Sequence, residues 1–222
     1  MSGLILKDIR LLSKQKKLAV LYVIVAVMLS FSMDTTFLVA YFSMIGALLV
    51  ITTLSYDSFD NGYPFLMTLP VEPKTYAYAK YAFSFLGLLA FWAASVVLQF
   101  ITLSIRKISF EFWDTILSDL IFFPVFLLII ALMIPISLKF GSEKARIVIL
   151  IIGAACFAIG YFAKSIMEKL VTDDVKIGLG KLITKLQELP QNSIVFVCLG
   201  ASLLILLISM MISVHVMKNK EF

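Results

Sequence analysis

The residues that come closest to a nucleotide-binding motif are Gly178 to Thr184, which read GLGKLIT. A phosphate-binding loop needs a glycine five positions before the second glycine and a Ser or Thr directly after the Lys, because these groups hold the phosphates and Mg²⁺. This segment has neither. No HExxH, GxSxG or EF-hand pattern occurs in the chain either. We therefore predict that the chain is not an enzyme and that it holds no cofactor of its own.

The remaining residues that could do chemistry are few. His215 is the single histidine, which disfavours a histidine-based metal site or charge relay within one chain. The two cysteines, Cys156 and Cys198, lie inside apolar runs and lack the spacing of a paired metal site or a disulfide framework. Free cysteine packs like a small hydrophobic residue. We interpret both as packing residues and predict no catalytic, cofactor or metal residue.

The composition indicates a membrane protein. Hydrophobic residues make up 61% of the 222 residues and charged residues 15%. Soluble domains contain about 45–50% apolar residues and about 25% charged residues. The net charge of +5 is spread between long apolar runs, and a nucleic-acid-binding protein would gather such charge on one face. We predict an all-α integral membrane protein with the lipid bilayer as its main solvent and no nucleic-acid partner.

Six apolar runs are long enough, or nearly so, to cross about 30 Å of hydrocarbon as helices. The turn around Asp34 joins the first two, and a re-entrant loop is the alternative there. We expect residues 1–17 to form an interfacial elbow helix and residues 18–222 a single transmembrane domain. The six predicted spans are Leu18–Met33, Thr36–Ser55, Tyr81–Ile105, Leu120–Leu138, Ile147–Ala163 and Ser193–Val214.

The distribution of Lys and Arg predicts the orientation. Most of the 19 Lys and Arg residues fall in the segments that share a side with the N-terminus, so the positive-inside rule places both termini in the cytoplasm. Ile5, Ile9 and Leu12 recur at helical spacing in the N-terminal segment, which is typical of an amphipathic helix at a membrane surface. The outer segment 164–192 also carries an apolar stripe, and it is either a surface connector or an element that contacts cargo.

The interiors of these predicted spans contain no Asp, Glu, Lys or Arg. Ion-coupled carriers keep such groups inside the membrane, so a transporter of this composition needs another source of energy. Gln99, Ser95 and Thr102 are polar residues of the third span. They either face a pathway or hydrogen-bond between helices, as polar residues in membrane helices commonly do.

The connection between the second and third spans, residues 56–80, combines acidic, aromatic, apolar and proline residues. This mixture favours a short helix that docks into another protein, and Lys80–Tyr81 is interpreted as an anchor of the third span at the interface. The predicted docking residues in this connection are Asp57, Asp60, Leu66, Met67, Leu69, Pro70, Glu72 and Lys74.

This connection resembles the cytoplasmic loop of the ABC transporter type 2 permease family. The resemblance rests on an acidic start at Tyr56-Asp57, a Leu69-Pro70-Val71 step and a Lys80-Tyr81 pair. The N-terminal Lys7-Asp8 pair and the six-span layout also resemble that family. Within it, the chain is most similar to the permeases of modulin exporters of Gram-positive bacteria.

The resemblance implies a permease of the bacterial cell membrane that works as a pair with an identical or a different permease. It also implies that each permease binds a separate cytoplasmic ABC ATPase, which holds ATP and Mg²⁺. The connection would act as a coupling helix, and the inner loop Lys139–Arg146, with Lys144 as its docking residue, would be a second, smaller contact. The cargo would be amphipathic peptides or hydrophobic molecules. A membrane anchor or sensor that recruits a cytoplasmic partner is the alternative, and an ion-coupled carrier is disfavoured by the missing charges.

Overall fold

The computed structural model describes residues 2–14, 16–32, 35–58, 62–68, 72–170 and 191–219. Every regular element in these ranges is a helix, so the all-α prediction is confirmed for this part of the chain. The helices are α1 (Ser2–Lys14), α2 (Lys16–Ser32), α3 (Thr35–Ser58), α4 (Gly62–Thr68), α5 (Pro73–Ile105), α6 (Phe112–Asp119), α7 (Phe122–Phe140), α8 (Ser142–Leu170) and α10 (Gln191–Lys218).

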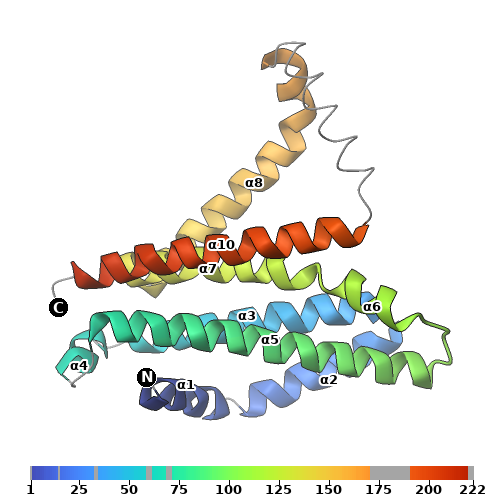
Figure 1. The fold of residues 1–222 in the computed structure, drawn as a ribbon, viewed down its shortest axis with the longest axis horizontal. Coiled ribbons are helices and arrows are strands. Elements are labelled where there is room, and N and C mark those ends of the chain that lie inside the picture. Colours follow the sequence, from blue (N-terminus) through green and yellow to red (C-terminus); the bar gives the residue numbers. More distant parts are fainter. Residues whose placement is uncertain are drawn as a thin grey trace.

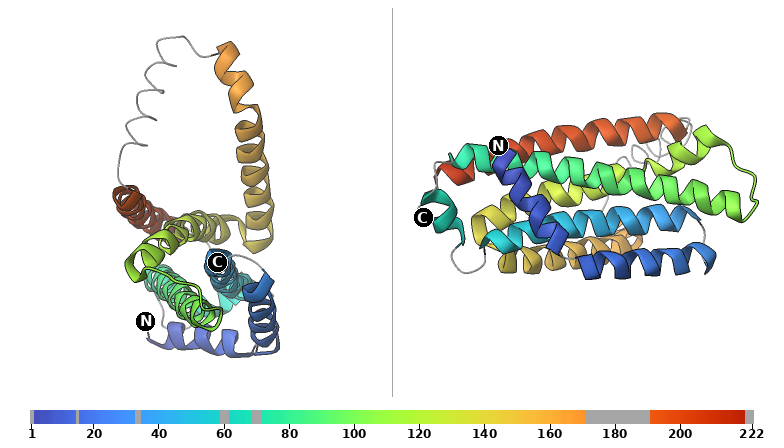
Figure 2. Two further views of the ribbon diagram at one scale, coloured as in Figure 1. Left: turned by 90° about the vertical axis from the view of Figure 1, so that its right-hand side faces the viewer. Right: turned by 90° about the horizontal axis from the view of Figure 1, so that it is seen from below.

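Four helices, α3, α5, α7 and α10, run along a common axis and form the body of the molecule (Figure 1). The pairs α3–α5 and α7–α10 make the most extensive contacts, and α3–α7 joins the two pairs. The short helix α4, the end of α10 and helix α1, which falls in the segment predicted as the elbow helix, lie at one end of this bundle, while α6 lies at the other (Figures 1 and 2). The connection between the second and third predicted spans therefore shares an end with both chain termini.

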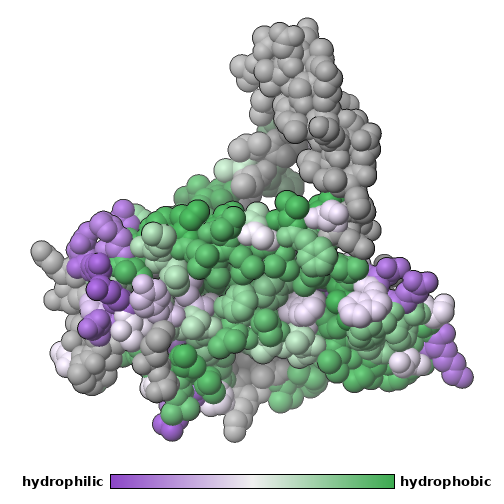
Figure 3. Space-filling model, in the orientation of Figure 1, coloured by the Kyte–Doolittle hydropathy of each residue, from purple (hydrophilic) through white to green (hydrophobic). Residues whose placement is uncertain are grey.

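The bundle has the surface of a membrane protein. Figure 3 shows a broad apolar band across the visible face of the bundle, with hydrophilic residues gathered at its two ends. Four helices of the described chain are long and apolar enough to cross a membrane: Thr35–Asp57, Pro73–Ile105, Phe112–Phe140 and Ser193–Lys218. They correspond to the second, third, fourth and sixth predicted spans. The first predicted span coincides with α2, whose apolar stretch Val20–Phe31 is shorter.

Helix α8 contains the fifth predicted span and diverges from the bundle axis (Figure 2). Its first turns pack on the bundle, where Ala145 is fully buried beside Ile51 and Met133. Farther along, Leu150 and Phe157 are strongly exposed. Several side chains of α8 lie outside the described residues, so six membrane crossings remain a prediction. The same holds for most of the outer segment 164–192.

The candidate spans extend beyond the predicted ones and take in charged residues. Helix α5 begins at Pro73, which suits the first helical position because proline lacks an N–H group that would need a partner there. Lys80 is therefore inside a continuous helix. Asp57 belongs to the last turn of α3, and Asp119 lies within the span Phe112–Phe140. The interiors of the predicted spans still contain no Asp, Glu, Lys or Arg, and these charged residues lie where the helices extend beyond the predicted bounds.

Close packing between α3 and α5 depends on Gly46. A Cβ atom at Gly46 would lie 2.5 Å from the Cβ atom of Phe91, which is fixed to the backbone of α5 and cannot swing aside. We expect Gly46→Ala to lower the free energy of unfolding by about 1–3 kcal/mol, as measured by denaturant unfolding in detergent. Gly153→Ala on α8 is the control, because nothing lies within 4 Å of its added methyl group. An equal loss at both positions would contradict tight α3–α5 packing.

Candidate functional site

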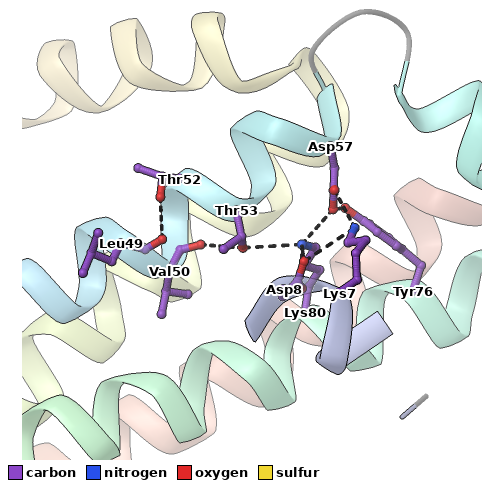
Figure 4. Close-up of polar contacts among 9 residues, drawn as sticks. All are labelled: Lys7, Asp8, Leu49, Val50, Thr52, Thr53, Asp57, Tyr76 and Lys80. Carbon is purple, nitrogen blue, oxygen red and sulfur yellow. Dashed lines mark hydrogen bonds and ion pairs between the residues drawn. The ribbon is translucent and has the colours of Figure 1, made fainter. Parts of the chain in front are cut away.

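Four charged side chains from three helices meet at the end of the bundle that carries α4 (Figure 4). We call this group the charge cluster. Two of its members come from α1, one from the end of α3 and one from the start of α5. Their hydrogen-bonding neighbours Thr53 and Tyr76 complete the site. The charged members are Lys7, Asp8, Asp57 and Lys80.

Lys80 is the centre of the charge cluster. Its Nζ atom donates to both carboxylate oxygens of Asp8 at 2.8 Å and lies 2.7 Å from Oδ2 of Asp57. The hydroxyl of Thr53 lies 3.4 Å from the same Nζ atom. A single ammonium group of α5 thus connects the elbow helix to the end of α3.

Asp57 receives two further hydrogen bonds. The Nζ atom of Lys7 lies 2.5 Å from its Oδ1 atom, and the Tyr76 hydroxyl donates to Oδ2 at 2.7 Å. Both carboxylate oxygens of Asp57 are therefore engaged by groups from α1 and α5. Lys7 also lies 3.5 Å from Oδ1 of Asp8, which closes the ring of charges.

The cluster is almost removed from solvent. Lys80, Asp8 and Asp57 are 1%, 1% and 5% exposed, and only Lys7 reaches the surface. Two positive and two negative groups sum to zero, which is the condition under which charges can be buried with hydrogen bonds to satisfy them. The sequence suggested that Lys80 anchors the third span at the membrane interface. In the structure Lys80 is instead buried, and it forms ion pairs that connect α5 to α1 and α3.

The charge cluster holds both ends of the connection that carries α4. Asp57 lies at its start, in the last turn of α3, while Tyr76 and Lys80 lie at its end, in the first turns of α5. At the start of α4, a Cβ atom at Gly62 would come within 2.6 Å of the Asp57 carbonyl oxygen, so only glycine allows this approach. A displacement of α4 would therefore act on α3, α5 and α1 together.

Helix α4 itself has one side packed on the bundle and one side open. Leu66 is buried in the main hydrophobic core with Leu54 and Tyr76. Phe65 is 69% exposed. An exposed phenylalanine on a short helix at a polar end of the molecule is suited to contact a partner protein. Sequence reasoning did not select Phe65, because the spacing of a seven-residue helix does not reveal which side faces outward.

The other predicted docking residues have different surroundings. Glu72 and Lys74 are exposed beside the start of α5, where a partner can reach them. Asp57 and Leu66 are internal, so they can support α4 but cannot form its outer surface. Three of the predicted docking residues, Asp60, Leu69 and Pro70, lie outside the described residues. For Met67 the structure describes the backbone but not the side chain.

Lys144 lies in the second predicted contact, in the first turn of α8. Together with Tyr56 and Arg146 it lines a surface pocket of about 500 Å³ against the end of α3. Arg146 donates to the Ser55 hydroxyl at 3.2 Å, which ties this turn to α3. Gly141 ends α7 with a φ of 85°, a conformation that favours glycine. The end of α3 thus lies between α4 and this pocket.

Nothing in this arrangement points to catalysis. Within the described ranges, no group of three His, Cys, Asp or Glu residues could hold a metal ion. The four charges of the cluster neutralise one another, and their ion pairs link α1, α3 and α5.

A comparison with known protein families decides the identity of the chain. The sequence profile described as ABC-2 family transporter protein matches residues 3–218. The chain belongs to the ABC-2 transporter family. The match covers every helix that contributes to the charge cluster. No curated protein and no solved structure matches the chain.

As an ABC-2 family member, the permease is a membrane component of a transport system and a multi-pass membrane protein. This agrees with the family resemblance seen in the sequence and disfavours a non-transporting anchor. The similarity to modulin exporters is finer than the family match and is considered below.

Proposed function

We propose that this ABC-2 permease is the membrane subunit of an ATP-driven exporter in a bacterial plasma membrane. In this proposal two permeases, identical or different, associate with two separate cytoplasmic ATPases that bind ATP and Mg²⁺. The observation that carries the proposal is the charge cluster, which connects both ends of the α4 connection to the elbow helix. Because these ion pairs connect α1, α3 and α5, a partner protein that binds α4 could move the ends of these helices together.

The proposed coupling runs through named contacts. The ATPase binds the exposed side of α4 and the neighbouring residues Glu72 and Lys74, and its second contact is the pocket beside Lys144. When the ATPases close, they displace α4. Because Asp57 and Lys80 are bound to each other and to α1, the ends of α3 and α5 would move as one unit.

The proposed cargo is an amphipathic peptide, with lipids or small hydrophobic molecules as alternatives. The charges of the cluster are bound to one another, so they do not offer a site for an ionic solute. The surface of the membrane helices is rich in exposed Phe, Leu and Ile, and α10 in particular is little buried within the chain. Such surfaces suit a second permease and the apolar face of a helical peptide.

The proposal predicts both assembly and stimulation. We expect the chain alone not to hydrolyse ATP, and its complex with the proposed ATPase to contain two copies of each subunit by mass measurement. In lipid nanodiscs, amphipathic helical peptides should raise ATP hydrolysis several-fold. Peptides of identical composition but scrambled order, which have no apolar face, are the control.

Two results would contradict the proposal. One is transport by the permease without any ATPase. The other is stimulation by small hydrophilic solutes in the absence of any response to amphipathic peptides. An intact complex that responds only to lipids would retain the exporter function and reject the peptide cargo.

A further inference from the structure

Asp119 is a fully buried carboxyl group at the end of α6, away from the charge cluster. It is 0% exposed, and it lies within the candidate span Phe112–Phe140. Its backbone carbonyl accepts a hydrogen bond from Nε1 of Trp92 at 3.1 Å, which fixes the end of α6 against the middle of α5. Its two carboxyl oxygens, in contrast, have no hydrogen-bond partner among the described residues.

Gln99 of α5 is the polar group that acts on this carboxyl. It is 1% exposed, and its Oε1 atom also lacks a hydrogen-bond partner in the described part of the chain. The neighbouring hydroxyls on α5 do not supply the missing donors: Ser95 donates to the carbonyl of Trp92, and Thr102 donates to the carbonyl of Leu98. Three oxygen atoms, two from Asp119 and one from Gln99, are thus buried without donors.

No cation among the described residues balances Asp119. Its surroundings on α5 are the amide of Gln99 and the indole of Trp92, and no charged side chain acts on the carboxyl. The charged residues of α5 closest in sequence to Gln99 are Arg106 and Lys107, about two turns away. On the chain leading to Asp119, Glu111 and Asp114 are exposed and acidic. An ionised Asp119 would therefore be an isolated negative charge in the membrane, which is strongly unfavourable.

A single proton on Asp119 would allow all three unsatisfied oxygens, two of Asp119 and one of Gln99, to take part in hydrogen bonds. A neutral carboxylic acid and a primary amide can form a ring of two hydrogen bonds, in which the acid O–H donates to the amide oxygen and the amide N–H donates to the acid carbonyl. We propose that Asp119 and Gln99 form a proton-binding site in which Asp119 holds a proton and donates it to Oε1 of Gln99. The ring would supply donors to the unsatisfied oxygens of both side chains.

A metal ion fits these residues less well. Hard cations such as Ca²⁺ and Mg²⁺ take six or more oxygen ligands, whereas this site offers three unsatisfied side-chain oxygens within the described ranges. The Asp119 carbonyl is already bound to Trp92. A proton needs only one acceptor besides the oxygen that carries it.

The position of the site gives the proton a structural role. The acid–amide ring would join α6 to α5 next to the junction between α6 and α7, where residues 120 and 121 interrupt the helix. If α6 separated from α5 and water entered, the ring would break and the acid would lose its proton. Protonated Asp119 is therefore a feature of the arrangement in which α5 and α6 are in contact.

Infrared difference spectroscopy tests the proposal on the full chain in lipid nanodiscs at neutral pH. Wild-type protein should show the C=O stretch of a protonated carboxylic acid, shifted in D₂O, and Asp119→Asn should lose this band. The matched control is Asp114→Asn, an exposed aspartate on the same helix. It should lose only carboxylate bands. Loss of carboxylate bands in Asp119→Asn, with no acid band in the wild type, would overturn the proposal.

A second variant keeps the test independent of the folding of Asp119→Asn. In Gln99→Leu the acid band should persist but shift to higher frequency, because the acid loses its amide partner. An unshifted band would show that Gln99 is not the partner. The melting temperature should also be the same in sodium and in choline salts, and a sodium-dependent rise that disappears in Asp119→Asn would identify a cation site instead.

Discussion

Replacing Lys80 with Met is expected to lower the free energy of unfolding by about 3–5 kcal/mol, the usual result of removing one partner from a buried ion pair. The variant leaves Asp8 and Asp57 buried, with Lys7 as the single remaining cation of the cluster. It also removes the hydrogen bonds that join α5 to α1 and α3. Denaturant unfolding in detergent, followed by circular dichroism, measures the change.

Two further variants make this result specific. Lys74→Met removes an exposed lysine from the same helix and should change the stability by about 0.5 kcal/mol or less. Adding Asp8→Asn to Lys80→Met restores neutrality, with Lys7 facing Asp57, and should recover part of the loss. Equal effects of Lys80→Met and Lys74→Met would show that the buried cluster does not stabilise the protein.

Replacing Phe65 with Asp is expected to weaken binding of the proposed ATPase by about 30-fold or more, which corresponds to about 2 kcal/mol, the level of an interface hot spot. The side chain is 69% exposed on α4, so the free permease should keep its fold. In the complex, however, the new carboxylate would be buried without a partner. Copurification and titration with the purified ATPase measure the loss.

The neighbouring residue provides the contrast. Leu66→Asp places a charge in the main core, so it should destabilise the permease itself before any partner binds. Phe65→Leu keeps an apolar side chain and should retain most of the affinity. If Phe65→Asp binds the ATPase as tightly as the wild type, α4 is not the docking helix.

The spans could be predicted from sequence because the criterion is local. A run such as Thr36–Ser55 or Ser193–Val214 has no solvent other than lipid, and its length alone predicts a crossing. The ends of the spans could not be predicted in this way. A lysine next to an apolar run, such as Lys80, normally extends toward the interface, and its true partner Asp8 is 72 residues away in the sequence.

The candidate site was predicted only in outline. The mixed character of the 56–80 connection indicated a docking element, but the inward packing of Leu66 depends on contacts with α3 and α5 that no local pattern contains. The same applies to Asp119, which directly precedes a predicted span. Its burial follows from the packing of α6 against α5, fixed by the hydrogen bond from Trp92.

The charge cluster also bears on the order in which the protein is synthesised and inserted. Lys7 and Asp8 leave the ribosome first, while Asp57 follows 50 residues after Lys7 and Lys80 follows 72 residues after Asp8. Before Lys80 emerges, Lys7 is the single cation available to Asp8 and Asp57. The charge cluster can therefore form completely only after the start of α5 has been made.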